Sequence, residues 1–163
     1  MGVRLPAELA FLLNELGYHW PEVDEEALHR QALAWLGFAG RLSGVAGRAD
    51  EAARAVRRGN AGEAVEAFLR EWRAGDAPRT VVAEGVTGAR VVAFCLLVCA
   101  ALVLALKIAM FVQLAALLAR IRLAVATAAA TSGGSLLSVA AAKRLTGLLL
   151  ELTRDRAARV LVA

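Results

Sequence analysis

The chain has 163 residues, of which 59% are hydrophobic and 6% aromatic, and it carries a formal net charge of +4. That length is enough for one domain with a buried core, and an apolar fraction made mostly of Ala, Leu and Val favours closely packed helices. The basic residues are neither interleaved with aromatics nor gathered in one run, so we expect no nucleic-acid partner. The two cysteines lack metal-ligand spacing and give no reason to expect a metal or another cofactor.

Charge is unevenly distributed along the chain. Residues 1–90 carry 11 basic and 13 acidic side chains, whereas residues 91–163 carry 8 basic and 2 acidic ones. The second part is also the more apolar. This combination favours contact with a membrane surface or with an acidic partner.

An N-terminal helix and a long second helix are predicted first. Leucines recur on one helical face over residues 5–16, and Gly17 is suited to end that helix. An acidic turn then introduces a long helix from about residue 23 to Arg58, with Gly59 at its end. Two heptad-spaced rows run through this helix as in a coiled-coil seam: Leu28, Trp35, Leu42, Ala49 and Val56, with Ala32, Ala39, Ala46 and Ala53.

A short amphipathic helix is predicted next. Asn60 and Glu63 have the spacing of a capping box, which predicts the start of this helix. Phe68 and Trp72 lie on its apolar face. Pro78 then opens the following segment, because proline is well suited to the first turn of a helix.

Residues 91–119 form a long apolar segment in which Lys107 and Gln113 are the polar interruptions. A membrane-spanning helix needs about 20 apolar residues, and the uninterrupted run here, residues 91–106, is shorter. A lysine near the centre of a bilayer is unfavourable unless it reaches an interface. We therefore favour the central helix of a bundle, and a membrane span remains the alternative.

A break is predicted around residues 132–134, and Ser135 is expected to cap a last, leucine-rich helix. Cys95 and Cys99 are interpreted as small buried hydrophobic residues. The predicted fold is an all-α, elongated bundle of about five helices, with a long heptad-patterned second helix and a very apolar fourth one. We expect a single domain over residues 1–163, with amphipathic helices in 1–76 and an apolar hairpin in 77–163.

Four glycines share one face of the long helix, nearly opposite the row of Trp35 and Leu42: Gly37, Gly40, Gly44 and Gly47. Each costs about 0.8–1 kcal/mol relative to alanine inside a helix. A smooth groove on that face would let another helix approach closely, either from this chain or from a partner. The alternative is an exposed face on which glycine is simply tolerated.

Large side chains are the candidate core anchors. We expect Tyr18, Trp20 and Trp35 to lock the N-terminal helix onto the long helix, with Leu42 in the seam. Phe68 and Trp72 complete this set of anchors. A recognition surface for a partner protein is the functional alternative for the same aromatics.

Catalysis is not expected. His19 and His29 share no helical face and have no Ser or Cys partner in a nucleophilic arrangement. The acidic residues 24–26 are better explained by the dipole at a helix N-terminus than by acid–base chemistry. No phosphate-binding loop with its lysine is present.

A family resemblance rests on residues 5–28, the helix that contains Trp35, residues 59–72 and the "LALK" of the apolar segment. Together they resemble the WXG-like N-terminal domain of actinobacterial polymorphic toxins, the outer membrane channel protein CpnT-like family. The resemblance implies an all-helical delivery module of a type VII (ESX) secretion substrate. In that family a linker and a C-terminal toxin domain normally follow. Here we expect no toxin domain within the chain, so the resemblance supports delivery rather than a toxic activity.

The predicted function is therefore a non-catalytic secretion or delivery module that acts by helix–helix recognition. Its partner would be a helical protein or the secretion machinery, and self-association and membrane contact are the further candidate interactions. Glu8 and Glu15 interrupt the early apolar segment, so we expect synthesis in the cytoplasm without a cleavable signal peptide, followed by secretion or association with the cell envelope. The alternatives are a small integral membrane or pore-associated protein built on residues 91–119, and a regulatory, antitoxin-like binding protein.

Overall fold

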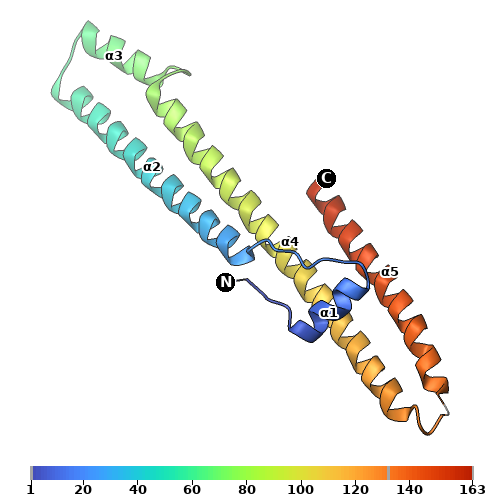
Figure 1. Cartoon of the computed structure of the whole chain (residues 1–163). Helices are drawn as coiled ribbons and strands as arrows, with labels where there is room; N and C mark the ends of the chain where they lie inside the picture. The colour runs from blue at the N-terminus through green and yellow to red at the C-terminus, as the bar shows by residue number, and fades with distance from the viewer. Residues whose placement is uncertain (1, 132, 163) are drawn as a thin grey trace. The chain divides into compact units, whose positions relative to one another are not determined.

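The computed structural model describes residues 2–131 and 133–162, and within them every regular element is a helix (Figure 1). The all-α class is confirmed. The helices are α1 (Ala7–Glu15), α2 (Glu25–Gly59), α3 (Glu63–Arg73), α4 (Pro78–Thr127) and α5 (Gly134–Val162). The heptad-patterned α2 and the very apolar α4 are the long helices that the sequence predicts.

The chain divides into two compact units. The first unit contains residues 1–27 and 99–163, and the second contains residues 28–98, so α2 and α4 contribute to both. The expected single domain, with its division between residues 76 and 77, stays a prediction.

In the first unit, α1 packs against the antiparallel pair formed by α5 and the second half of α4 (Figure 1). The core of this unit is a cluster of leucines and one methionine: Leu9, Leu12, Leu13, Met110, Leu114 and Leu150. An isolated helix as short as α1 is not stable in water. Its burial in this cluster therefore holds it in place.

In the second unit, α2 runs beside the first half of α4, and α3 connects them (Figure 1). The contact is built from small residues. Ala39 packs with Val86 and Ala89 of α4, and Leu42 lies against this cluster. A Cβ on Gly85 would lie 3.2 Å from Cδ2 of Leu42, so glycine allows the close approach of the two helices here.

Several helix ends follow the sequence prediction. Gly17 has a φ of +81°, and its N–H and that of Tyr18 donate to the last carbonyls of α1. Pro78 is the first residue of α4. The acidic first turn of α2 contains Glu25 and Glu26 as predicted, but Asp24 precedes the helix as its N-cap, since its Oδ1 accepts from the N–H groups of Glu26 and Ala27 at 3.0 and 3.1 Å.

Two predicted caps are wrong. The amide of Asn60 donates to the carbonyl of Val56 at 3.0 Å, so Asn60 serves the end of α2, and Gly62 with a φ of +111° precedes α3. Ser135 lies inside α5, where its hydroxyl donates to the carbonyl of Ala124 and its N–H donates to Thr131 Oγ1. A short polar side chain can satisfy either neighbouring helix end, and spacing alone does not decide which. Ser132, within the predicted break, lies outside the described residues.

Candidate functional site

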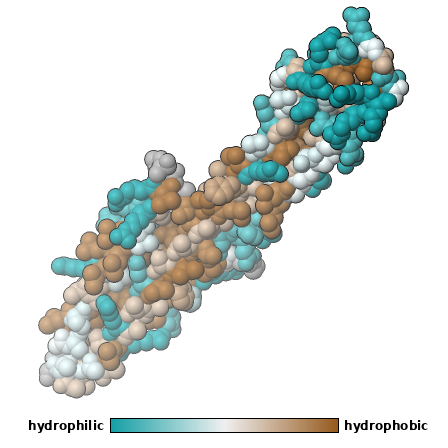
Figure 2. Space-filling view, turned by 180° about the vertical axis from the view of Figure 1, so that it is seen from behind, coloured by the Kyte–Doolittle hydropathy of each residue, from teal (hydrophilic) through white to brown (hydrophobic). Residues whose placement is uncertain are grey.

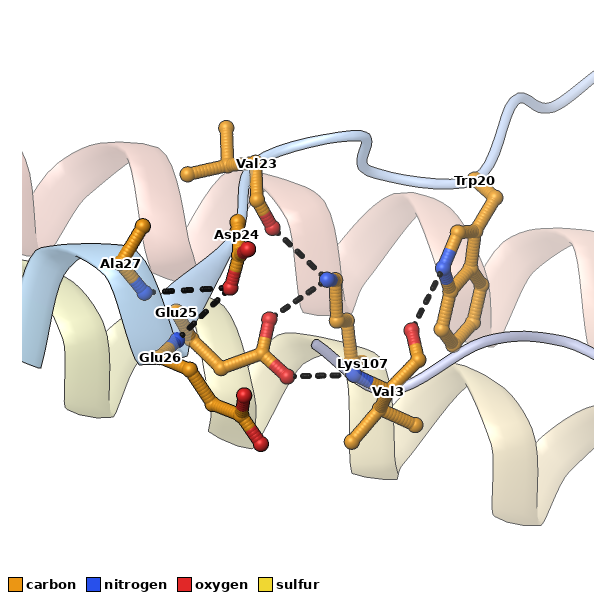
Figure 3. A network of polar contacts seen from close by, with 8 residues as sticks. All are labelled: Val3, Trp20, Val23, Asp24, Glu25, Glu26, Ala27 and Lys107. Carbon is orange, nitrogen blue, oxygen red and sulfur yellow. Dashed lines mark hydrogen bonds and ion pairs between the residues drawn. The ribbon is translucent and has the colours of Figure 1, made fainter. Parts of the chain in front are cut away.

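Lys107 is buried in the first unit and forms an ion pair with Glu25 (Figure 3). The two residues are 3% and 6% exposed, and the Lys107 Nζ lies 2.6 Å from Oε2 of Glu25. The same ammonium donates to the carbonyl of Val23 at 2.7 Å. The positive charge of Lys107 is thus compensated inside the protein by the carboxylate of Glu25, which lies in the first turn of α2.

Glu25 also holds the N-terminal segment (Figure 3). Its Oε1 accepts from the N–H of Val3 at 2.6 Å, and the Val3 carbonyl accepts from the indole of Trp20 at 3.2 Å. The hydrogen bond from Lys107, followed by that from the Val3 N–H, lowers the pKa of the Glu25 carboxyl from 4.5 to about 2. Glu25 therefore stays ionised and joins three parts of the first unit.

Gln113 is the second polar residue of the apolar segment. Its Nε2 donates to Thr153 Oγ1 on α5 at 3.0 Å. Its Oε1 is buried and has no hydrogen-bond partner in the part of the chain that the structure describes. Gln113 therefore links α4 to α5 through a hydrogen bond from its amide nitrogen, while its amide oxygen is left without a partner among the described residues.

Tyr18 and Trp20 are both half-buried against the leucine cluster of the first unit. The hydroxyl of Tyr18 donates to the carbonyl of Gly147 on α5 at 3.0 Å. The hydrogen bonds of this pair therefore go to α5 and to the N-terminal segment, and its apolar contacts are with the leucine cluster of the first unit.

Trp35 is not a core anchor, which corrects the sequence interpretation. It is 40% exposed, and its ring makes an edge-to-face contact with Phe38 of the same helix. The buried row of α2 is instead the alanine row, with Ala32, Ala39 and Ala53 buried. A seam packed through alanine is too narrow for an indole, so the larger row of the heptad is displaced to its margin.

The aromatics of α3 lie at a polar contact with α2. Trp72 stacks on Phe68, and its indole N–H donates to Oδ1 of Asp50 at 3.0 Å. Arg79 at the start of α4 lies 3.6 Å from the same oxygen. Phe68 is 39% exposed and Trp72 is half-buried and hydrogen-bonded, so Trp72 is the anchor of this pair.

The glycine face of α2, made of Gly37, Gly40, Gly44 and Gly47, is open. A Cβ on Gly40 or Gly47 would meet no atom within 4 Å. At Gly37 and Gly44 it would meet only the tip of an arginine of the same helix, at 3.6 and 3.7 Å. No other helix of the described chain therefore packs on this face. The four glycines are then explained either by a partner chain that packs there or by an exposed face on which glycine is tolerated.

Replacing Gly40 by alanine is expected to raise the free energy of unfolding by about 0.5–1 kcal/mol, because the site has helical geometry and free space. Gly85→Ala is the matched control, since Leu42 crowds that position and should reduce or reverse the gain. Urea denaturation of the purified chain measures both. A loss of stability in Gly40→Ala would mean that the chain itself covers this face.

A leucine stripe lies on the outward face of α5. It consists of Leu137, Leu145, Leu148 and Leu152, all exposed, with Leu137 at 80%. The opposite face of the same helix buries Thr146 and Leu150 in the first unit. A hollow of about 430 Å³ between α4 and α5 opens beside Leu145. Such a stripe with helical spacing is suited to receive a second helix.

The apolar segment of α4 is largely uncovered. Within the described residues, one helical stretch that includes α4 is long and apolar enough to cross a membrane, and 17% of its most apolar window is buried. Figure 2 shows hydrophobic atoms spread over much of the face that it presents. Cys95 is exposed and Cys99 half-buried, so the expectation of two buried cysteines is wrong.

Comparison with known families decides the classification. The family described as "WXG100 like domain" matches residues 6–149, which includes α1 to α4 and the first half of α5. The chain belongs to the WXG100-like family. Neither a curated protein nor a solved structure matches it.

The WXG100-like family is associated with the helical-hairpin proteins of type VII secretion, which are secreted, typically non-enzymatic and commonly paired with helical partners. The uncovered faces of this WXG100-like chain are consistent with such pairing. Among the described residues, no group of three or more His, Cys, Asp or Glu side chains could hold a metal ion.

Proposed function

We propose that this WXG100-like chain is a non-catalytic delivery module of a type VII secretion substrate, of the kind that precedes the toxin domain in actinobacterial polymorphic toxins. The proposal rests chiefly on the leucine stripe of α5. Burial of a leucine side chain contributes roughly 1.5–3 kcal/mol, and four exposed leucines on one helical face leave much of that energy available to a partner.

The proposed mechanism is helix–helix recognition without a covalent step. A helical partner, either a second protein or part of the secretion machinery, would lie along the leucine stripe with a side chain in the hollow beside Leu145. The glycine face of α2 is proposed as a second contact, because Gly40 and Gly44 leave room for close helix approach.

Export should depend on the stripe. Leu148→Gln combined with Leu152→Gln is expected to lower the amount of the chain in the culture medium severalfold in a host with a type VII machinery, without loss of helix content by circular dichroism. Both side chains are already exposed, so folding does not depend on them. The readout is the ratio of secreted to cellular protein, with and without the secretion ATPase.

The matched control is Ile108→Gln combined with Val112→Gln, which removes two similarly exposed apolar side chains from α4. Export of the control should equal that of the unmodified chain. Export that persists when the machinery is deleted would contradict the delivery module.

A membrane-associated protein is the second candidate, because the most apolar window of α4 is so little buried. If the chain is a membrane-associated protein, it should stay in the membrane fraction during alkaline carbonate extraction and be released only by detergent. The Ile108 and Val112 variant, rather than the Leu148 and Leu152 variant, would then alter its location.

A further inference from the structure

We infer that a hollow in the second unit binds a small oxyanion of the phosphate class. The hollow has a volume of about 240 Å³ and lies between the second half of α2, α3 and the start of α4. Its charged lining consists of Asp50, Arg54, Arg57, Arg73 and Arg79, and Leu69, Trp72 and Ala53 complete it.

The lining has an excess of three positive charges. Asp50 is its acidic residue, and it is already shared between Arg79 and the indole of Trp72. No carboxylate of the described residues lies within 4.0 Å of a nitrogen of the other three arginines, so their charge is not compensated by an ion pair.

Three helices are needed to bring these arginines together. Arg54 and Arg57 are three residues apart and therefore neighbours on one face of α2, Arg73 is the last residue of α3, and Arg79 is in the first turn of α4. The hydrophilic surface around α3 is visible in Figure 2. Asp50 accepts a hydrogen bond from the indole of Trp72 and lies 3.6 Å from Arg79, so it links the parts of the lining that come from α2, α3 and α4.

The chemistry of the lining selects the ligand. Guanidinium groups are planar and bind phosphate oxygens in pairs, through charge-assisted hydrogen bonds. A hollow of this volume excludes a whole helix, which is about 10 Å across. A compact ligand with several negative charges, such as pyrophosphate, fits both the size and the charge.

Calorimetric titration of the full chain with sodium pyrophosphate, against sodium chloride at equal ionic strength, tests this inference. We expect a dissociation constant on the order of 1 mM or tighter, since two or three charge-assisted hydrogen bonds suffice for it. Arg54→Gln combined with Arg57→Gln should weaken binding by about tenfold or more. A quenching or shift of the tryptophan fluorescence on titration that is absent from the Trp72→Phe variant provides a second readout.

Arg41→Gln combined with Arg48→Gln is the matched control. This double variant removes two positive charges from α2, as the first one does, but at positions that do not line the hollow. Both double variants are expected to keep the helix content of the unmodified chain. Absence of pyrophosphate binding at millimolar concentration would overturn the inference. The inference would also be overturned if the two double variants weakened pyrophosphate binding equally, because binding would then reflect general attraction by surface charge.

Discussion

Glu25→Gln is expected to lower the free energy of unfolding by about 3–5 kcal/mol, because it leaves the buried ammonium of Lys107 without its counter-charge. The Val23 carbonyl would remain as its described partner. Urea denaturation at neutral pH measures the effect. A loss below 1 kcal/mol would mean that Lys107 reaches water without Glu25.

The exposed pair of Glu8 and Arg122 is the matched control. Its two side chains are as close as those of the buried pair, at 2.6 Å, but both face solvent. Glu8→Gln should therefore cost at most about 1 kcal/mol. Combining Glu25→Gln with Lys107→Met should be less destabilising than the sum of the single changes, because the unpaired charge is then removed.

The buried pair of Glu25 and Lys107 also makes the stability of the protein depend on pH. The folded pKa of Glu25, about 2, lies below its ordinary value of 4.5, so the stabilisation is complete above about pH 5 and is lost as the pH falls toward 2. The unmodified chain should lose more stability over this range than Glu25→Gln, in which the group cannot titrate. Parallel loss in both proteins would assign the acid sensitivity to other carboxyl groups.

Leu13→Ala is expected to lower the free energy of unfolding by about 2–5 kcal/mol, because it opens a cavity in the leucine cluster of the first unit. Leu13 is 1% exposed on α1 and packs with the cluster residues of α4 and α5. Thermal and urea denaturation followed by circular dichroism measure the change, which should be accompanied by faster proteolysis of the N-terminal segment.

Phe11 on the same helix provides the control, since it is 70% exposed. Phe11→Ala removes a larger side chain but should change stability by no more than about 0.5 kcal/mol. If Phe11→Ala cost as much as Leu13→Ala, the outer face of α1 would be covered in solution, and self-association of the chain would be the explanation to examine by sedimentation.

Local signals in the sequence are sufficient to predict the helices, although they misassign the caps at Asn60 and Ser135. Gly17, Pro78 and the glycine after Arg58 act within one helical turn, so their effect on helix ends can be predicted from neighbouring residues. The heptad of α2 predicts a seam but does not say which of its two rows is central. The error at Trp35 follows from this, because close packing of α2 on α4 through Ala39 and Ala89 leaves no room for an indole.

Long-range pairs are not encoded in any short pattern. Lys107 in an apolar run does imply a buried counter-charge, but 82 residues separate it from Glu25, and several other carboxylates were equally available. The anion-binding hollow likewise needs arginines from three helices. The outward leucines of α5 were visible as a leucine-rich helix, yet which of them stay exposed depends on how α5 packs on α4.

The discontinuous make-up of the first unit has a consequence for the order of folding during synthesis. Residues 28–98 pack among themselves, so their contacts can form as soon as that stretch has left the ribosome. The residues of α1 are made first but find Met110, Leu114 and Leu150 only after most of the chain has been translated. Until then the earliest leucines remain without a core, and a nascent-chain chaperone would meet them in that state.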